Sequence, residues 1–165
     1  MYYFAYGSNL DVSQMTDRCP EAEPVGTALL RDHTLAFGGH SPNWEGAPAT
    51  VVPDEEADVP GLVYEVSYDE IRVLDHYEGH PVRYERRLES VFHRDEGTTR
   101  KAQIYIKEVD GPLGHPPASY LSVLKEAYET LGFDLEILER ALALGSEARN
   151  AAREGDPQPA AVGSD

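Results

Sequence analysis

The stretch MYYFAYGSNL, residues 1–10, joins a short apolar and aromatic run to the turn-forming residues Gly, Ser and Asn. This pattern predicts a buried strand over Met1–Ala5 that leads into a tight loop. Similar short runs, separated by Gly, Pro, Asp and Asn, predict further strands at Val25–Leu30, His33–Phe37, Ala49–Pro53, Gly61–Val66, Arg83–Phe92 and Arg100–Ile106. Regularly spaced short strands favour a barrel or a sandwich over a parallel doubly wound sheet.

Two segments have helical patterns instead. Ser67 is followed three residues later by Glu70, a capping box that predicts a helix inside the strand series. Residues 117–144 space their apolar side chains as two helices would, with the break at Gly132 and the second helix starting near Asp134. A closed barrel removes strand edges and can hold one small ligand. We therefore expect an α+β fold: a small, mainly antiparallel β-barrel with one internal helix and C-terminal helices.

The length of 165 residues fits one domain. Composition changes at about Gly145, where the sequence becomes poor in large apolar residues and rich in Ala, Gly, Pro and charge. Such a segment buries too little surface to offset the entropy of ordering it. We therefore expect a single domain over residues 1–150 and a flexible polar tail over residues 151–165.

The net charge of −16, from 30 acidic and 14 basic side chains, argues against nucleic acid and against an anionic membrane surface as partners. No apolar run approaches the roughly 20 residues of a transmembrane helix, and the N-terminal stretch lacks the basic region of a signal peptide. A single cysteine, Cys19, excludes an internal disulfide and suits a reducing compartment. These features predict a cytoplasmic protein. The acidic surface favours a monomer but leaves the oligomeric state open.

The first candidate site is the loop Tyr6-Gly7-Ser8-Asn9-Leu10. Gly7 can adopt a positive φ, and successive backbone N–H groups in such a turn can converge on an anion. Ser8 and Asn9 add short polar side chains beside it. The same residues are also common in an ordinary strand-ending turn, where Ser and Asn bond to their own backbone.

The second candidate is Glu78 in the stretch LDHYEG, residues 74–79, at the predicted end of the internal helix. A carboxylate at a helix C-terminus feels the negative end of the helix dipole, and a partly apolar pocket raises its pKa further. Both effects move Glu78 toward the range in which it can transfer a proton at neutral pH. The alternative is a solvated surface carboxylate, with Asp75 as a cap or ion-pair partner and His76 on the surface.

Metal and nucleophile sites are not expected. His76 and His80 are four residues apart, but Gly79 between them ends the helix that would align them. Cys19 has no marked basic cluster, apart from Arg18, to make it a catalytic thiol. The sequence contains no phosphate-binding or dinucleotide-binding fingerprint, and we expect no cofactor.

Several motifs occur together in this chain. They are YGSNL after the first strand, FGG near residue 38, G-x-V-Y at 61–64, LDxxEG with Glu78, Pro-Pro-x-x-Tyr at 116–120, and Tyr105 in a late strand. In this combination the sequence resembles the γ-glutamylcyclotransferase family, also called AIG2-like. The resemblance extends to about residue 145, and YGSNL together with LDxxEG is far more specific than either motif alone.

The resemblance implies a small barrel-like α+β fold with a cavity for a small substrate that carries a γ-glutamyl group. That group would be released as 5-oxoproline together with a free amino acid or amine, without a cofactor. Glu78 would take a proton from the α-amine and later donate one to the leaving amine. The glutamyl α-carboxylate and ammonium would bind to backbone groups of Gly7, Ser8, Asn9 and Leu10, with the Tyr6 side chain nearby.

The resemblance also implies that Tyr105 and Tyr120 line the pocket and hydrogen-bond the substrate. The loop from Gly38 would border the cavity, with Trp44 either walling the acceptor side or serving as an exposed loop anchor. The motifs leave the other half of the substrate open: an amino acid, the ε-amine of lysine, glutathione or a γ-glutamyl-protected intermediate. Two other functions stay open, a non-catalytic domain that retains the γ-glutamyl pocket and a pathway-specific enzyme that acts on a larger substrate.

Overall fold

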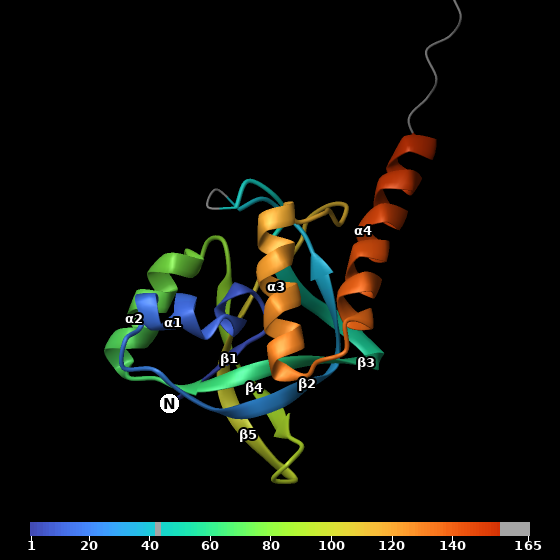
Figure 1. The fold of residues 1–165 in the computed structure, drawn as a ribbon. Coiled ribbons are helices and arrows are strands. Elements are labelled where there is room, and N and C mark those ends of the chain that lie inside the picture. Colours follow the sequence, from blue (N-terminus) through green and yellow to red (C-terminus); the bar gives the residue numbers. More distant parts are fainter. Residues whose placement is uncertain (42–43, 156–165) are drawn as a thin grey trace, which may run out of the picture.

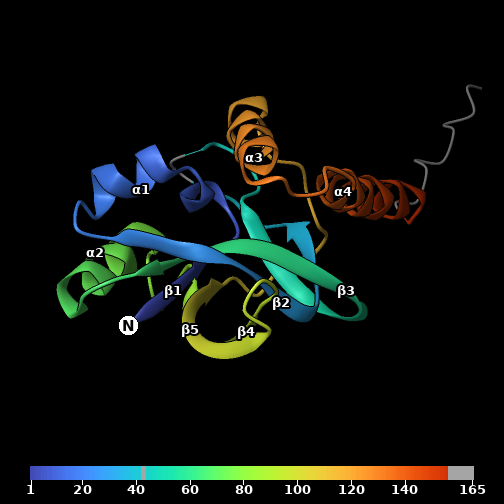
Figure 2. The ribbon, with the colours of Figure 1, turned by 60° about the horizontal axis from the view of Figure 1, so that its bottom comes forward.

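The strands curl into a closed barrel, and the helices lie outside it (Figures 1 and 2). This computed structural model describes residues 1–41 and 44–155. In chain order its elements are β1 (Tyr2–Ala5), a 3-10 turn η1 (Ser8–Leu10), α1 (Val12–Arg18), β2 (Glu23–Phe37), β3 (Ala49–Glu65), α2 (Tyr68–Glu78), β4 (Glu85–His93), β5 (Thr98–Ile106), α3 (Ala118–Leu131) and α4 (Glu136–Glu154). The neighbours around the barrel follow the order β1-β3-β2-β4-β5.

Strand β1 closes the barrel because it pairs on both sides. Its residue Tyr3 lies opposite Tyr64 of the antiparallel strand β3 and opposite Gln103 of the parallel strand β5. The pairs β2–β3, β2–β4 and β4–β5 are all antiparallel. The predicted fold class, an α+β fold built on a mainly antiparallel barrel, is therefore confirmed.

Strands β2 and β3 are longer than the predicted strands. The structure joins the segments predicted at 25–30 and 33–37 into β2, and those predicted at 49–53 and 61–66 into β3. The acidic residues between the last two segments do not end the strand. Instead the ladder shifts its register, so that Arg31 pairs with Asp58 whereas His33 pairs with Pro53. Extra residues are accommodated as an irregularity because their charged side chains extend into solvent.

Helix α2 begins as the sequence predicts, because Ser67 and Glu70 form the reciprocal hydrogen bonds of a capping box. Helix α1 was not predicted. Its seven residues are too few for a hydrophobic period, and the local signal is the cap alone, where Asp11 accepts the Ser13 N–H at 3.0 Å. This short helix nevertheless buries Met15 against the core.

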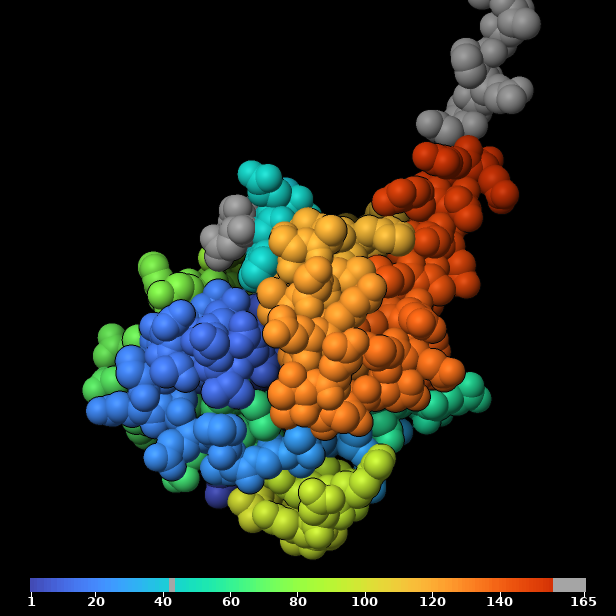
Figure 3. Space-filling model, viewed as in Figure 1, coloured from blue at the N-terminus to red at the C-terminus, as the bar shows by residue number. Residues whose placement is uncertain are grey.

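Helices α3 and α4 separate at Gly132, as predicted, with this glycine in a left-handed conformation at φ 71°. They lie side by side over one flank of the barrel, and α4 continues beyond it (Figures 1 and 3). Helix α4 includes residues 151–154, which the sequence analysis assigned to the flexible tail. Residues 156–165 of that tail lie outside the described residues, and the division into one domain and a tail stays a prediction.

The core fills the barrel and extends under the helices. Its fully buried side chains include Phe4 of β1, Tyr64 of β3 and Ile104 of β5, together with Leu74 of α2 and Leu124 of α3. None of the helices in the described part of the chain is long and apolar enough to cross a membrane.

Gly61 of β3 lies so close to β1 that a Cβ would overlap the Phe4 ring and the Ala5 carbonyl oxygen. We expect Gly61→Ala to lower the free energy of unfolding by about 1–3 kcal/mol, because the overlap forces packed strands apart. Urea unfolding followed by circular dichroism measures this loss. Gly155→Ala is the matched control, since a Cβ there comes no closer than 3.5 Å to other atoms. Equal losses in the two variants would contradict the importance of this close approach.

Candidate active site

A pocket opens where the turn after β1, the end of α2 and the loop between β2 and β3 meet. It encloses about 660 Å³, including its open mouth. Most of the predicted site residues line it: Tyr6, Gly7, Ser8, Asn9, Trp44, Glu78, Tyr105 and Tyr120. Leu10, which was predicted to bind the substrate through its backbone, and Gly38, which was predicted to wall the pocket, are not part of its lining. The fold thus brings the two sequence motifs, YGSNL and LDxxEG, onto one cavity.

Glu78 is the last residue of α2, and Gly79 ends the helix with a φ of 68°. Burial raises the pKa of the half-buried Glu78 carboxyl from 4.5 to about 7, and the positive charges of Arg18 and Arg83 oppose that rise. Among the described residues, no basic side chain forms an ion pair with this carboxylate. At neutral pH the carboxyl therefore populates both protonation states, as a group that takes and returns a proton must.

Asn9 connects the turn to Glu78. Its Nδ2 lies 3.0 Å from the Tyr3 hydroxyl and 3.5 Å from Oε1 of Glu78. Its Oδ1 accepts hydrogen bonds from Gln14 Nε2 and Arg18 Nη1, each at 3.0 Å. Because two donors bind the oxygen, the amide nitrogen must face the carboxylate. Asn9 therefore donates toward Glu78 from a fixed orientation.

The prediction of a positive φ at Gly7 is wrong, because its φ is −108°. A Cβ at this position would approach the Tyr120 hydroxyl to 3.1 Å. Glycine is therefore favoured because a side chain would be crowded, and not because the backbone is left-handed. Leu10 is buried in the core, and its N–H donates to the Gly7 carbonyl at 3.0 Å. The N–H groups of Ser8 and Asn9 come first in the turn, where a helix provides no internal partner. The Ser8 N–H already interacts with the Tyr120 hydroxyl and lowers the pKa of that group, although burial outweighs this effect.

Three buried tyrosines differ in what their hydroxyls can offer. Tyr6 donates to the Tyr105 carbonyl at 2.5 Å, which leaves its oxygen as an acceptor. Tyr105 donates to Asp75 at 2.7 Å, so its proton is already used and its ring forms the pocket wall. Tyr120 accepts the Ala49 N–H at 3.1 Å, and no acceptor for its own proton occurs in the described part of the chain. Burial raises the pKa of all three, so they remain neutral.

The loop between β2 and β3 contributes Trp44 to the pocket wall. Its ring packs edge-on against Tyr120, with the ring centroids 5.0 Å apart. Gly38 is buried, and a Cβ at this position would overlap the Val109 side chain. Gly38 is not among the residues that line the pocket, and its lack of a side chain makes room for Val109.

The sequence analysis missed the basic residues of the pocket. Arg18, Arg83 and Lys107 line it, together with Tyr3 and Tyr84. Arg18 belongs to the unpredicted helix α1, whereas Arg83 and Lys107 follow the ends of α2 and β5 and lie in no motif. In the sequence Arg83 is only the first residue of a predicted strand and Lys107 only the residue after another, and many surface residues occupy such positions.

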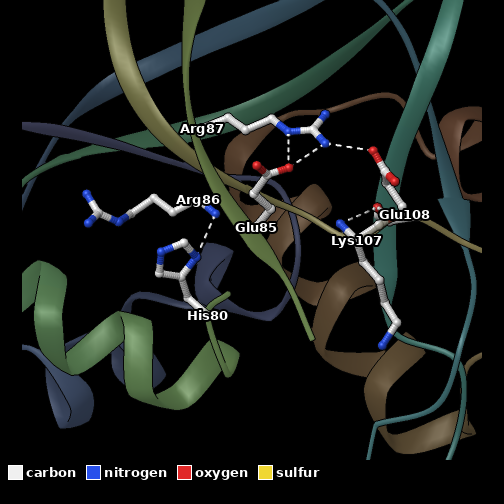
Figure 4. A network of polar contacts seen from close by, with 7 residues as sticks. His80, Glu85, Arg86, Arg87, Lys107 and Glu108 are labelled. Atoms are coloured by element: carbon white, nitrogen blue, oxygen red, sulfur yellow. Dashed lines mark hydrogen bonds and ion pairs between the residues drawn. The ribbon is translucent and has the colours of Figure 1, made fainter. Parts of the chain in front are cut away.

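Beside the pocket, charged side chains join the ends of β4 and β5 (Figure 4). Arg87 forms ion pairs with Glu85 at 2.6 Å and with Glu108 at 2.8 Å. His80 accepts the backbone N–H of Arg86 through Nδ1 at 3.0 Å. Across the described residues, no group of three or more His, Cys, Asp or Glu side chains is arranged to hold a metal ion.

A family model described as gamma-glutamyl cyclotransferase, AIG2-like, matches residues 3–122. The γ-glutamylcyclotransferases of Homo sapiens and Bos taurus are each 36% identical over 81 residues, which are 47% of this chain and 43% of each relative. The chain thus matches less than half the length of these curated relatives.

Solved structures agree with this match over almost the whole chain. A γ-glutamyl cyclotransferase superimposes with a TM-score of 0.77 at 25% identity, covering 94% of this chain and 99% of the other. A human protein described as uncharacterized has a TM-score of 0.76 at 25% identity, covering 92% of this chain and 97% of its own. Because the family model matches more than half of its residues, this chain belongs to the γ-glutamylcyclotransferase, AIG2-like family.

Proposed function

We propose that the chain is an enzyme that releases 5-oxoproline from a γ-glutamyl amino acid or amine, with Glu78 as its general acid/base. The observation that carries this proposal is the Glu78 carboxyl, whose pKa is raised to about 7 by burial in the pocket beside the turn after β1. Membership of the family supports the same reaction, as do the curated relatives named γ-glutamylcyclotransferase.

The proposed reaction requires no covalent bond to the protein. The α-amine of the glutamyl group attacks its own γ-carbonyl, the ring C–N bond forms, and the C–N bond to the leaving amine breaks. Glu78 takes one proton from the attacking amine and returns one to the leaving nitrogen, so the protons balance and no water is consumed. Holding the two reacting groups together lowers the barrier by several kcal/mol, and one acid/base contributes about 10²–10⁴-fold.

The polar groups around Glu78 suit the glutamyl half of such a substrate. Because the Tyr6 proton is bonded to the Tyr105 carbonyl, the Tyr6 oxygen would accept a hydrogen bond from the α-amine. The N–H groups of Ser8 and Asn9 would bind the α-carboxylate. Tyr120 would donate to the γ-carbonyl oxygen as negative charge develops on it.

Trp44 would wall the side of the pocket that takes the leaving group.

Two alternatives use the same cavity: a domain that binds γ-glutamyl compounds without turnover, and an enzyme that removes the γ-glutamyl group from one larger pathway intermediate. Product analysis separates them, because only the binding domain releases no 5-oxoproline from any γ-glutamyl compound that it binds.

We expect the protein to form 5-oxoproline from members of a panel of γ-glutamyl dipeptides and γ-glutamyl amines, as measured by mass spectrometry. Glu78→Gln should lower kcat by about 10²–10⁴-fold, because the amide cannot carry the proton. The matched control is Glu129→Gln, which alters an exposed glutamate in the last turn of α3, outside the pocket. Full activity in Glu78→Gln would remove this residue from the mechanism, and no product from the folded wild type would favour the binding domain.

The pH dependence of kcat/KM should reflect the ionisation of Glu78. Glu78 accepts a proton only when ionised, and its pKa is raised to about 7. We expect kcat/KM to fall about tenfold per pH unit as the pH drops below about 7, and to level off above it. Steady-state rates at constant ionic strength across this range measure the profile. A limb near the ordinary glutamate pKa of 4.5 instead would show that burial does not tune Glu78.

The raised pKa should also cost stability at neutral pH. Between pH 4.5 and about 7 the folded protein keeps the Glu78 proton that the unfolded chain has lost. Stability therefore decreases as the pH rises through this window, and the loss is complete above it. We expect Glu78→Gln to raise the free energy of unfolding by about 1–3 kcal/mol at about pH 8, with little change at about pH 4. Urea unfolding at both pH values tests this, and a gain of equal size at both would mean that the glutamine acts through packing.

A further inference from the structure

The connection from α2 to β4 forms a large part of the pocket wall. Four residues of this short segment line the cavity: Tyr77, Glu78, Arg83 and Tyr84. The Glu78 side chain has little to hold it, because its hydrogen-bond partner in the described part of the chain is Asn9 alone, at 3.5 Å. The position of the Glu78 carboxyl therefore depends on how firmly the backbone of this connection is held.

Three contacts close the base of the connection into a ring. The His80 N–H donates to the Asp75 carbonyl at 2.9 Å, where α2 ends. The Arg86 N–H, at the start of β4, donates to His80 Nδ1 at 3.0 Å (Figure 4). The Arg86 side chain then returns to the helix, where its Nε lies 2.9 Å from Asp75 Oδ1. The last turn of α2, which ends at Glu78, is thereby joined to β4.

The barrel holds both members of the ion pair between Asp75 and Arg86. Asp75 Oδ1 accepts the Tyr105 hydroxyl of β5 at 2.7 Å, and Arg86 Nη1 donates to Gln103 Oε1 of the same strand at 3.2 Å. The Arg86 Nε has no aligned hydrogen bond, so its contact with Asp75 is an ion pair. The two side chains are 20% and 27% exposed, and salt screens such a partly buried pair less than a surface pair.

This ion pair does not act on Glu78 through direct contact or through charge. Neither Asp75 nor Arg86 is among the described residues that line the pocket. The charges that act on the Glu78 carboxyl are those of Arg18 and Arg83. The link from the ion pair to Glu78 is instead the backbone of the last helical turn, which covers three residues from Asp75 onward.

We propose that Asp75 and Arg86 are positioning residues, whose ion pair holds the last turn of α2 against the barrel and so fixes the Glu78 carboxyl in the pocket. The inference rests on the proposed function. Opening the ring would let the last turn move, and a misplacement of about 1 Å can lower a rate by about 10²-fold. It would also admit water to the Glu78 carboxyl, and so remove the burial that raises its pKa.

Two variants separate this positioning from a direct effect of charge. Asp75→Ala removes a negative charge and Arg86→Gln a positive one, so direct electrostatics would lower the pKa of Glu78 in the first and raise it in the second. A loosened turn lowers that pKa in both variants, from about 7 toward 4.5. An NMR titration of the side-chain carboxyl carbons measures the pKa, and the Glu78 signal is the one that is missing in Glu78→Gln.

The kinetics should change in the same two variants. We expect kcat to fall by about 10–10²-fold and KM to stay nearly constant, because neither side chain lines the pocket. Asp75→Asn keeps an oxygen that can accept from Tyr105, so its kcat should lie between those of the wild type and Asp75→Ala. Glu96→Ala and Arg100→Gln are the matched controls. They break a more exposed ion pair away from the pocket, and should keep the wild-type kcat and Glu78 pKa.

Two results would overturn the inference while the proposed function stands. Opposite shifts of the Glu78 pKa in Asp75→Ala and Arg86→Gln would reduce the pair to a charge effect. An unchanged pKa with an unchanged kcat in both variants would show that the ring does not position Glu78.

The titration also decides the inference if the reaction is absent. If the folded wild type forms no 5-oxoproline, the proposed function fails. Downward pKa shifts in both variants then still support the positioning of Glu78, and opposite or absent shifts reject it. If Asp75→Ala does not fold, Asp75→Asn takes its place with the same expected direction of shift.

Discussion

Strand β1 is paired with β3 on one side and with β5 on the other, and the geometry of the pocket depends on this double pairing. The turn after β1 is attached to both of these neighbours as well. Tyr64 of β3 donates its hydroxyl to the Asn9 carbonyl at 2.8 Å, and Tyr105 of β5 accepts the Tyr6 hydroxyl on its carbonyl. A turn that is held from two sides keeps its N–H groups in one arrangement. A ligand then binds without the entropic cost of ordering the turn.

Helix α2 carries a glutamate near each end, and the fold treats the two in opposite ways. Glu70 is buried but fully bonded: it accepts the Ser67 N–H at 2.9 Å and the Glu21 N–H at 3.0 Å. Glu78 is half-buried and has only the 3.5 Å contact from Asn9 as a hydrogen-bond partner in the described part of the chain. The hydrogen-bonded carboxylate of Glu70 fixes where the helix begins. The carboxyl of Glu78, which has few hydrogen-bond donors around it, keeps the raised proton affinity that the proposed catalysis requires.

The sequence indicated the barrel, the capped helix α2 and the break at Gly132, because each has a local signal in residue type and spacing. It also associated Glu78 with the turn after β1, because the motifs YGSNL and LDxxEG occur together in the family that the sequence resembles. It did not reveal Arg83 or Lys107, because a basic residue after a helix or strand has no pattern that distinguishes a pocket wall from a surface. The prediction of a positive φ at Gly7 was wrong for a related reason. A side chain is excluded there because a Cβ would come close to the Tyr120 hydroxyl, and Tyr120 is distant in sequence.

Slow chemical ageing of the protein would affect the pocket most at Asn9. Deamidation there would replace the donating Nδ2 by an oxygen, and two carboxylates would face each other where Asn9 now meets Glu78. A like charge raises the pKa of a carboxyl, so Glu78 would stay protonated at neutral pH. Deamidation begins when the backbone nitrogen of the next residue attacks the side-chain amide. In this fold that nitrogen belongs to Leu10 and is bonded to the Gly7 carbonyl, so the turn that shapes the pocket also protects its amide from hydrolysis.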